Sequence, residues 1–362
     1  MNLCGSGIRI EVLTYKKVIG EAKPPLSVSS LYLSMRDLLL EDVCSDIGQI
    51  SPIVHNLASR IRAKVSLFKM NKQEAFTYVA GVDAGSQILP LASRRYAVIS
   101  ALVYSLPSGT KYYLEPESIS FPYTSAGEKH LGVVNIRREA KLYETACSYI
   151  EEKGTVDLLL IDGPLYFSNW WKMAGKPTDR KRLIDAINDL VTLCQETDTV
   201  LAGIVKRPSA RYLVYNLDLQ HETDLPDSFL LHHTLKPGER TEVFSPRTAV
   251  RKAVRDTPFM DAIRCPIYSY YCKLSKDWSI TPVRVDIPAF SLGHLEDIAN
   301  YCYSTSFWNG IPLPILKADE EVKITKRFIK EVYGDMISRV SRETIGLEYL
   351  VPYWGERSWM GV

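Results

Sequence analysis

Two apolar stretches of this chain each end in an aspartate that is followed within two residues by glycine. The first, YVAGVDAGSQ at residues 78–87, carries Asp83, and the second, VDLLLIDGPL at residues 156–165, carries Asp162. Such apolar runs indicate buried strands, and the glycines mark the points where the chain turns. One Asp-Gly turn would be ordinary. Two of them, each ending a buried strand, predict a divalent-metal site at the edge of a sheet.

The bulk composition fits a globular chain with a substantial core. The chain has 362 residues, 46% of them hydrophobic, and a net charge of +2, so any basic surface for a polyanionic partner must be local. Seven cysteines occur without a CxxC pair, which indicates neither a zinc knuckle nor a disulfide framework. No apolar run approaches the roughly 20 residues that span a bilayer, and the N-terminus lacks the layout of a signal peptide. We therefore expect a cytoplasmic protein with no membrane segment.

The order of the expected elements is that of an α/β protein. A largely helical segment at 27–68 comes first. It is followed by strands at 78–82, 94–106 and 110–116, a helix at 136–152, a strand at 156–161, a helix at 179–195 and a strand at 198–208. Three strands with short connections predict an antiparallel meander, and the apolar run at 156–161 predicts a central strand covered on both faces. The whole pattern predicts a mixed sheet flanked by helices.

The second half of the chain has a less regular pattern. Strands are expected at 230–235, 241–244, 267–274 and 281–289, and helices at 291–303 and 320–340. The region at about 215–290 has two interpretations, because its strands would either join the first sheet or form an inserted second domain.

Three acidic residues of the first half are candidate metal ligands. They are Asp83, Asp162 and Glu144, the last on the expected helix at 136–152. Carboxylates repel one another unless a cation lies between them, so a gathered group is typical of a magnesium or manganese site. Two such ions can activate a water molecule and hold the leaving oxygen of a phosphodiester. The group therefore points to nuclease chemistry.

The helix at 136–152 offers two glutamates for this role. Glu139 and Glu144 are five residues apart, so their side chains point in different directions and only one should face the metal. We assign Glu144, because it lies beside Tyr143 and Cys147 on the apolar stripe that must pack on the sheet. Glu139 stays open as the alternative.

Four sequence blocks, in this order, resemble those of the NurA nuclease family. They are DAGSQ at 83–87, LLLIDGPL at 158–165, GIVKRPSARYL at 203–213 and GIPLPILKAD at 310–319. The resemblance implies an α/β fold with an RNase H-like core, a mixed five-stranded sheet, an N-terminal helical arm and a C-terminal α+β extension. The implied domains are a helical, partner-binding arm at 1–75, the nuclease domain at 76–325 and a C-terminal helix and tail at 326–362.

The resemblance also implies an activity and partners. NurA proteins form an archaeal and bacterial family of manganese-dependent 5′-to-3′ exonucleases with endonuclease action on single strands; magnesium is the alternative metal. The resemblance implies a homodimer whose channel admits DNA. It also implies docking on the hexameric HerA ATPase, a translocase. Both act in DNA end resection during double-strand break repair by homologous recombination, beside a separate nuclease–ATPase break-repair complex.

The family's functional residues can be carried onto this sequence one by one. Its first-strand metal aspartate falls on Asp83, its helix glutamate on Glu144 and its second aspartate on Asp162. Its lysine after the fifth strand falls on Lys206, which would neutralise the scissile phosphate as a compact point charge. The neighbouring Arg207 and Arg211 would then bind backbone phosphates of DNA. The alternative interpretation of these basic residues is an ordinary exposed strand end.

The chain departs from the family pattern in the fourth block. The family's tyrosine and histidine on either side of the Pro-Leu-Pro segment are replaced by Ile311 and Asp319. Asp319 can bind manganese through oxygen, but it offers no neutral imidazole. The intact Asp83, Glu144 and Asp162 favour an active nuclease with Asp319 as a fourth metal ligand.

Two rival functions follow from the same residues. One is a paralogue with weakened catalysis that clamps DNA or recruits a motor ATPase through its helical arm. The other is a sugar-kinase-like protein with a related strand order, which is disfavoured because no glycine-rich loop for the phosphates of ATP is present.

Overall fold

The computed structural model describes residues 30–91, 94–122, 127–154, 156–167, 176–253, 262–342, 346 and 350. The chain forms two compact units, which divide between Asn56 and Leu57. This boundary falls inside helix α2 (Ser30–Lys64), which occupies most of the segment expected to be helical at 27–68.

The described part of the first unit is the stretch of α2 that precedes Leu57. Its large apolar side chains are mostly exposed, which is typical of a surface that binds a partner. The exposed members are Tyr32, Met35, Leu38, Leu39, Leu40, Val43, Ile47, Ile50 and Ile53.

The second unit is built on one mixed sheet, whose strand order is β1-β8-β9-β10-β7-β6-β2-β3-β4, with β5 also paired to β3. Its strands are β1 (Leu67–Lys69), β2 (Val79–Pro90), β3 (Arg94–Leu106), β4 (Thr110–Tyr113), β5 (Glu117–Pro122), β6 (Leu158–Asp162), β7 (Val200–Val205), β8 (Glu239–Thr241), β9 (Ile267–Cys272) and β10 (Val283–Pro288). Its helices after α2 are α3 (Gly127–Lys153), α4 (Pro177–Glu196), α5 (Tyr212–Asn216), α6 (Asp227–Thr234), α7 (Pro246–Ala253), the 3-10 helix η3 (Ala289–His294), α8 (Leu295–Thr305), α9 (Leu313–Val322) and α10 (Lys326–Arg342).

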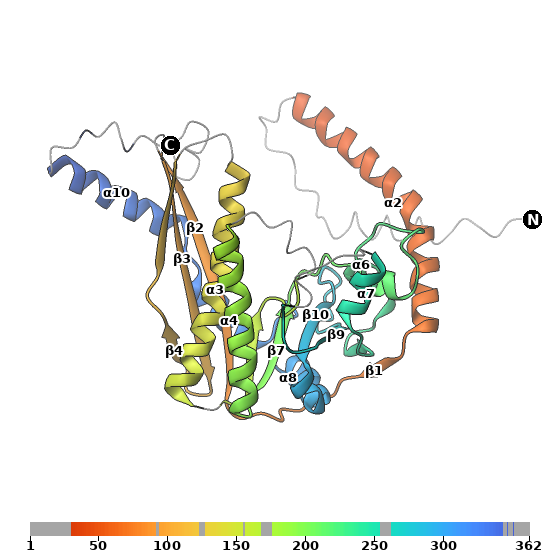
Figure 1. Ribbon diagram of the computed structural model, residues 1–362. Coiled ribbons are helices and arrows are strands. Elements are labelled where there is room, and N and C mark those ends of the chain that lie inside the picture. The colour runs from red at the N-terminus through yellow and green to blue at the C-terminus, as the bar shows by residue number, and fades with distance from the viewer. Residues whose placement is uncertain are drawn as a thin grey trace, which may run out of the picture. The chain divides into compact units, whose positions relative to one another are not determined.

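Five strands form the RNase H-like core that the family resemblance implies. Strands β2, β3 and β4 make an antiparallel meander, and β6 and β7 run parallel to β2. The long helices α3 and α4 lie side by side along this core (Figure 1). The expected α/β class with a mixed sheet is confirmed. The sheet is wider than five strands, because β10, β9, β8 and β1 continue it beyond β7.

Strand β6 is the centre of the core, as its continuous apolar run predicts. Its four apolar residues are fully buried. Leu159 and Ile161 pack on the side of α3 and α4, whereas Leu158 and Leu160 pack on the opposite side. Such alternation buries both faces of a strand, and it brings the strand's last residue, Asp162, to the edge of a rigid platform.

The structure differs from the sequence interpretation in the second half of the chain. The segment at 230–235, expected as a strand, belongs largely to helix α6, because a short apolar run does not distinguish helix from strand. Helix α9 begins directly after Pro312, with Pro314 in its first turn, where proline is well tolerated. The expected helix at 320–340 is interrupted, because α9 ends at Val322 and α10 begins at Lys326.

Candidate metal centre

Asp83 points from strand β2 toward helix α9. Its neighbours Gly81 and Gly85 share its face of the strand, since side chains alternate along a strand. A Cβ atom on Gly81 would lie 2.3 Å from the carbonyl carbon of Pro314, and one on Gly85 would lie 2.6 Å from the carbonyl oxygen of Val322. The two glycines thus let α9 lie directly on β2, with Asp83 between them and only 9% exposed.

The parallel register of β2 and β6 brings the second aspartate beside the first. Val82 pairs with Ile161, so Asp83 and Asp162 occupy neighbouring positions. Helix α9 contributes Asp319 from above the sheet. One carboxylate oxygen of each aspartate lies within 4.8 Å of the other two. Three residues at least 79 positions apart in the sequence therefore lie together in one small site.

Lys206 lies within this group of aspartates. It follows β7, whose Ile204 pairs with Asp162. Its Nζ lies 2.6 Å from Asp162 Oδ2 and 2.9 Å from Asp319 Oδ1. The ammonium group partly compensates the three carboxylates, and a compact charge on a flexible stem can exchange partners. The position is therefore one in which a cation is already favourable.

The charges of this site shift the pKa of each group. Burial, together with the charge of Asp162, raises the pKa of Asp83 to about 8. Burial also raises the pKa of Asp162, although Lys206 opposes this. For Asp319, the hydrogen bond and charge of Lys206 outweigh burial and lower the pKa. Carboxylates that resist ionisation in the absence of a counter-charge are typical of a site that a cation completes.

Glu144 does not lie in this group, contrary to the sequence assignment. Its carboxylate forms an ion pair with Arg182 of α4, with 2.6 Å between Oε1 and Nε. Arg182 also binds Glu117 of β5. The apolar stripe of α3 does pack on the sheet, but Glu144 lies at its margin and turns toward α4.

Glu139 is the glutamate of α3 that approaches the aspartates. Its Oε2 would lie 3.5 Å from a Cβ on Gly163, the residue after Asp162. Its Oε1 accepts a hydrogen bond of 2.6 Å from Arg138, while Oε2 is buried without a partner among the described residues. Burial raises the pKa of Glu139 despite Arg138, and the charge of Asp162 adds to this. A buried carboxylate oxygen with no donor is suited to a metal ligand.

The sequence contained a signal for Glu139 that the spacing argument missed. Glu139 lies four residues before Tyr143, so the two share one face of the helix. Tyr143 is fully buried in the core between α3 and the sheet. Glu139 therefore faces the sheet because it is one helical turn from Tyr143. Glu144 is next to Tyr143 in the sequence but points in another direction.

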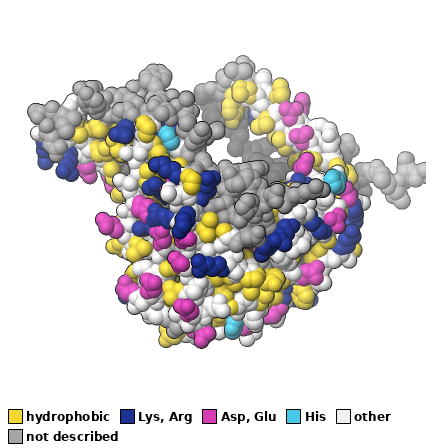
Figure 2. Space-filling model, in the orientation of Figure 1, with side chains coloured by type: hydrophobic (Ala, Val, Ile, Leu, Met, Phe, Trp, Pro, Cys, Tyr) yellow, Lys and Arg dark blue, Asp and Glu magenta, His cyan; other side chains and the backbone are white. Residues whose placement is uncertain are grey.

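The two candidate phosphate-binding arginines have different environments. Arg207 follows Lys206 and is exposed. Arg211 is half-buried and binds Asp224, with 3.1 Å between Nη1 and Oδ1, and also the backbone oxygens of Thr223 and Gln220. It is thus engaged in its own loop. Figure 2 shows Lys and Arg side chains in several groups on one face of the molecule, mixed with Asp and Glu side chains.

Ile311 lies at the position of the family tyrosine. It is half-buried against the core beside α8, and its side chain offers no metal ligand. Among the described residues, the gathered donors are oxygens of Asp83, Asp162 and Asp319, and Glu139 lies beside Gly163. This donor set fits magnesium or manganese, which prefer carboxylate oxygen.

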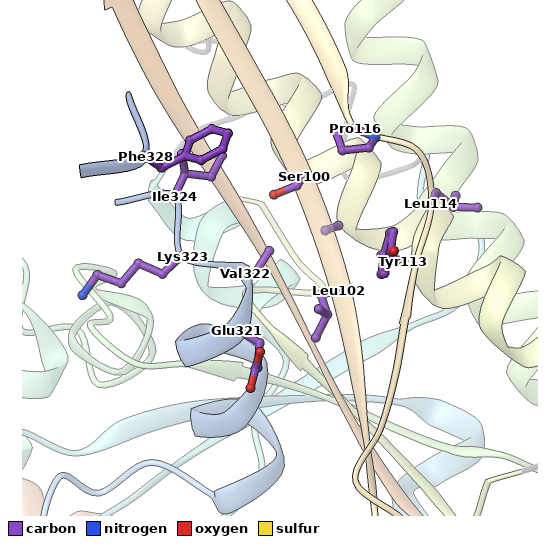
Figure 3. A pocket seen from close by; sticks show the side chains of 11 residues that line it. Ser100, Leu102, Tyr113, Leu114, Pro116, Glu321, Val322, Lys323, Ile324 and Phe328 are labelled. Carbon is purple, nitrogen blue, oxygen red and sulfur yellow. The ribbon is translucent and has the colours of Figure 1, made fainter. Parts of the chain in front are cut away.

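A separate open pocket of about 280 Å³ lies beside the end of α9 (Figure 3). Leu102 and Val322 line it, with Tyr113 and Phe328 on different sides. The pocket contains none of the three aspartates. The candidate metal centre is therefore the group of aspartates on β2, β6 and α9, and it is separate from this cavity.

Carboxylates gathered on the central strands of the RNase H-like core fit the metal sites of nucleases that use divalent ions. Residues 78–324 match the NurA domain, which covers more than half of the chain. The chain therefore belongs to the NurA family.

Comparison with solved structures shows the same fold. The NurA nuclease from Sulfolobus solfataricus aligns with a TM-score of 0.61 at 16% identity, over 86% of this chain and 98% of that chain. A crystal structure of NurA with manganese aligns with a TM-score of 0.52 at 12% identity, over 82% of this chain and 98% of that chain. No curated protein matches the sequence. Among the described residues, no helix has the length and apolarity to cross a bilayer.

Proposed function

We propose that this protein is a DNA nuclease that hydrolyses phosphodiesters with manganese, or magnesium in its place. The observation that carries the proposal is the convergence of Asp83, Asp162 and Asp319 within 4.8 Å. These residues would hold the metal, and Glu139 takes the role that spacing had assigned to Glu144. When bound, the metal lowers the pKa of the attacking water and stabilises the leaving oxygen.

The protein's own residues would position the substrate. Lys206 bridges Asp162 and Asp319 in the absence of other cations. Once a metal neutralises these carboxylates, the ammonium group would be free to bind a non-bridging oxygen of the scissile phosphate. The exposed Arg207, one residue further, would bind an adjacent phosphate and set the register of the strand. Arg211 would act indirectly, by holding the loop that follows.

Family membership supports a more specific proposal. We propose 5′-to-3′ exonuclease action and endonuclease action on single strands, in DNA end resection with a HerA-type hexameric ATPase and beside a nuclease–ATPase break-repair complex. We also propose a cytoplasmic homodimer. The exposed apolar side chains of α2 between Tyr32 and Ile53 support a partner surface, because such a face is costly to leave in water.

End-labelled DNA tests the hydrolytic proposal. The wild type, Asp83→Ala and Asp335→Ala are incubated with Mn²⁺, with and without the hexameric ATPase. Asp335 is an exposed aspartate of α10 and serves as a matched control. We expect wild type and Asp335→Ala to digest DNA and Asp83→Ala to lose about 100-fold or more in rate. Equal digestion by Asp83→Ala would remove Asp83 from the mechanism.

The second candidate is a scaffold that binds DNA or recruits the ATPase without hydrolysis. The replacement of the family tyrosine and histidine by Ile311 and Asp319 favours it. In the same experiment, DNA binding by the wild type without digestion under any condition would support the scaffold over the nuclease.

A further inference from the structure

The turn that follows Asp162 is held more tightly than an ordinary surface turn. This turn, here called the elbow, consists of Gly163, Pro164 and Leu165. Gly163 has a φ of 154°, a conformation that L residues rarely adopt. Its N–H donates a hydrogen bond of 3.1 Å to the carbonyl oxygen of Ile204 on β7. The elbow thus folds back over the sheet instead of extending into solvent.

A buried aspartate on a different strand binds the end of the elbow. Asp286 lies in β10, is fully buried and pairs with Gly203 of β7. Its Oδ2 accepts a hydrogen bond of 3.1 Å from the backbone N–H of Leu165. A charged acceptor makes this bond stronger than a bond between neutral groups. Strand β10, outside the five-stranded core, is therefore connected to the residue three positions after a metal ligand.

Asp286 is itself fixed in place by two donors. Arg284, also buried, approaches with Nε 2.8 Å from Oδ1 and Nη2 3.0 Å from Oδ2. The hydroxyl of Ser269 on β9 donates to Oδ1 at 2.7 Å. Both carboxylate oxygens therefore have partners, and the side chain has one orientation. A buried ion pair rarely adds net stability over apolar residues of similar size. The pair is therefore weak evidence for a contribution to stability.

The elbow has two further contacts that leave it no other position. The hydroxyl of Tyr143 on α3 donates a hydrogen bond to the carbonyl oxygen of Pro164. A Cβ on Gly203 would lie 2.6 Å from the carbonyl oxygen of Gly163, so only glycine fits beneath the elbow. Tyr143 is one helical turn from Glu139, so the helix that carries Glu139 is bound to the elbow.

We propose that Asp286 is a positioning residue of the metal centre. It acts on Asp162 through the N–H of Leu165, and it touches neither metal nor DNA itself. The inference rests on the proposed metal-dependent function of the aspartates. Residues that orient a ligand carboxylate commonly change metal affinity by about 10- to 100-fold when they are replaced.

Manganese titration without DNA tests this role separately from catalysis. The variant is Asp286→Asn, because an amide cannot accept hydrogen bonds on both of its ends. The matched control is Asp227→Asn. Asp227 is also fully buried and accepts bonds from the N–H groups of Leu213 and Val214 and from the Tyr271 hydroxyl. It has no contact with the elbow among the hydrogen bonds of the described residues.

We expect both variants to lower the melting temperature and only Asp286→Asn to weaken Mn²⁺ binding, by about 10- to 100-fold. If Asp286→Asn fails to fold, the double variant Arg284→Met/Asp286→Ala replaces it, because it removes the pair without leaving a buried unpaired charge. Unchanged Mn²⁺ affinity in the folded variant, or an equal loss in Asp227→Asn, overturns the inference.

The same titration separates this inference from the proposed function. If the wild type binds Mn²⁺ but digests no DNA, the proposed nuclease activity is contradicted. The role of Asp286 is then still judged by the difference in Mn²⁺ affinity between the wild type and Asp286→Asn. Wild type that binds no Mn²⁺ contradicts both.

Discussion

Asp319 of helix α9 accepts a hydrogen bond from Lys206, with 2.9 Å between Oδ1 and Nζ, so a residue of the C-terminal block is bound to the end of strand β7. The family histidine at this position would be neutral near pH 7 and would bind a metal through nitrogen. The aspartate instead adds a negative charge to Asp83 and Asp162. Lys206 partly compensates this added charge.

Replacement of Asp319 tests whether it is a ligand or only a partner of Lys206. We expect Asp319→Asn to weaken Mn²⁺ binding by at least about tenfold, since loss of a mere supporting residue already costs that much. Isothermal titration with Mn²⁺ measures the change, and Asp335→Asn is the exposed control. Wild-type affinity in Asp319→Asn would show that Asp319 serves Lys206 alone.

Manganese binding should strengthen as the pH rises toward about 8. Burial raises the pKa of Asp83 from its ordinary 3.8 to about 8, so the metal-free folded protein keeps a proton that the unfolded chain loses near pH 4. The contribution of Asp83 to the unfolding free energy of the metal-free protein is therefore greatest below about pH 4. It decreases as the pH rises from about 4 to about 8. Metal binding must displace this proton. Below pH 8, the Mn²⁺ affinity should therefore rise about tenfold for each unit by which the pH increases.

Titrations at several pH values between 6 and 9 in buffers of different ionisation enthalpy measure both the affinity and the proton release. Asp83→Asn removes the titrating group and should flatten the pH profile while it weakens binding. A wild-type affinity that is the same at all of these pH values contradicts the assignment.

Replacement of Glu139 and of Glu144 on α3 should have different effects on Mn²⁺ binding and DNA digestion. Glu139→Gln removes the buried carboxylate beside Gly163, and we expect it to reduce both Mn²⁺ affinity and DNA digestion. Glu144→Gln breaks a partly exposed ion pair with Arg182, and we expect a loss of about 1 kcal/mol or less in unfolding free energy with unchanged digestion. Digestion assays and chemical denaturation of both variants provide the measurement. The reverse pattern would restore the assignment of Glu144.

The contact between β2 and α9 should be sensitive to a single methyl group. In Gly81→Ala the new Cβ would meet the backbone of Pro314, at 2.3 Å from its carbonyl carbon, so α9 must move away. We expect a loss of about 1–3 kcal/mol in unfolding free energy and weaker Mn²⁺ binding, because α9 carries Asp319. Gly334→Ala in helix α10 is the matched control, since its Cβ meets nothing within 4 Å. That control should be stabilised by up to about 1 kcal/mol.

Much of the site could be predicted from local sequence. Asp162 ends strand β6 and Lys206 follows β7, so the parallel pairing of these two strands brings them together once the sheet forms. The expected strand end at Asp83 was wrong, because β2 continues to Pro90, and Asp83 reaches the site through the pairing of β2 with β6. Asp319 was identified as a candidate ligand through the family resemblance. The hydrophobic pattern had not predicted α9 as a helix separate from the one expected at 320–340.

The remaining features depend on contacts between segments that are distant in the sequence. The apolar stripe of α3 and the family resemblance both assigned Glu144, yet the position of Arg182 on α4 draws that side chain away and leaves Glu139 beside the strand end. Nothing local predicted that β10 would join the sheet next to β7, or that its Asp286 would bind the turn after Asp162.

The sequence by itself determined the α/β class, the central strand and the aspartate at the end of that strand, because hydrophobic periodicity and turn residues act over a few neighbouring positions. The tertiary structure decided which glutamate faces the aspartates, how α9 lies on its two glycines and what supports Asp162. These depend on where side chains from separate elements meet, which is fixed only when the sheet, α3, α4 and α9 pack together.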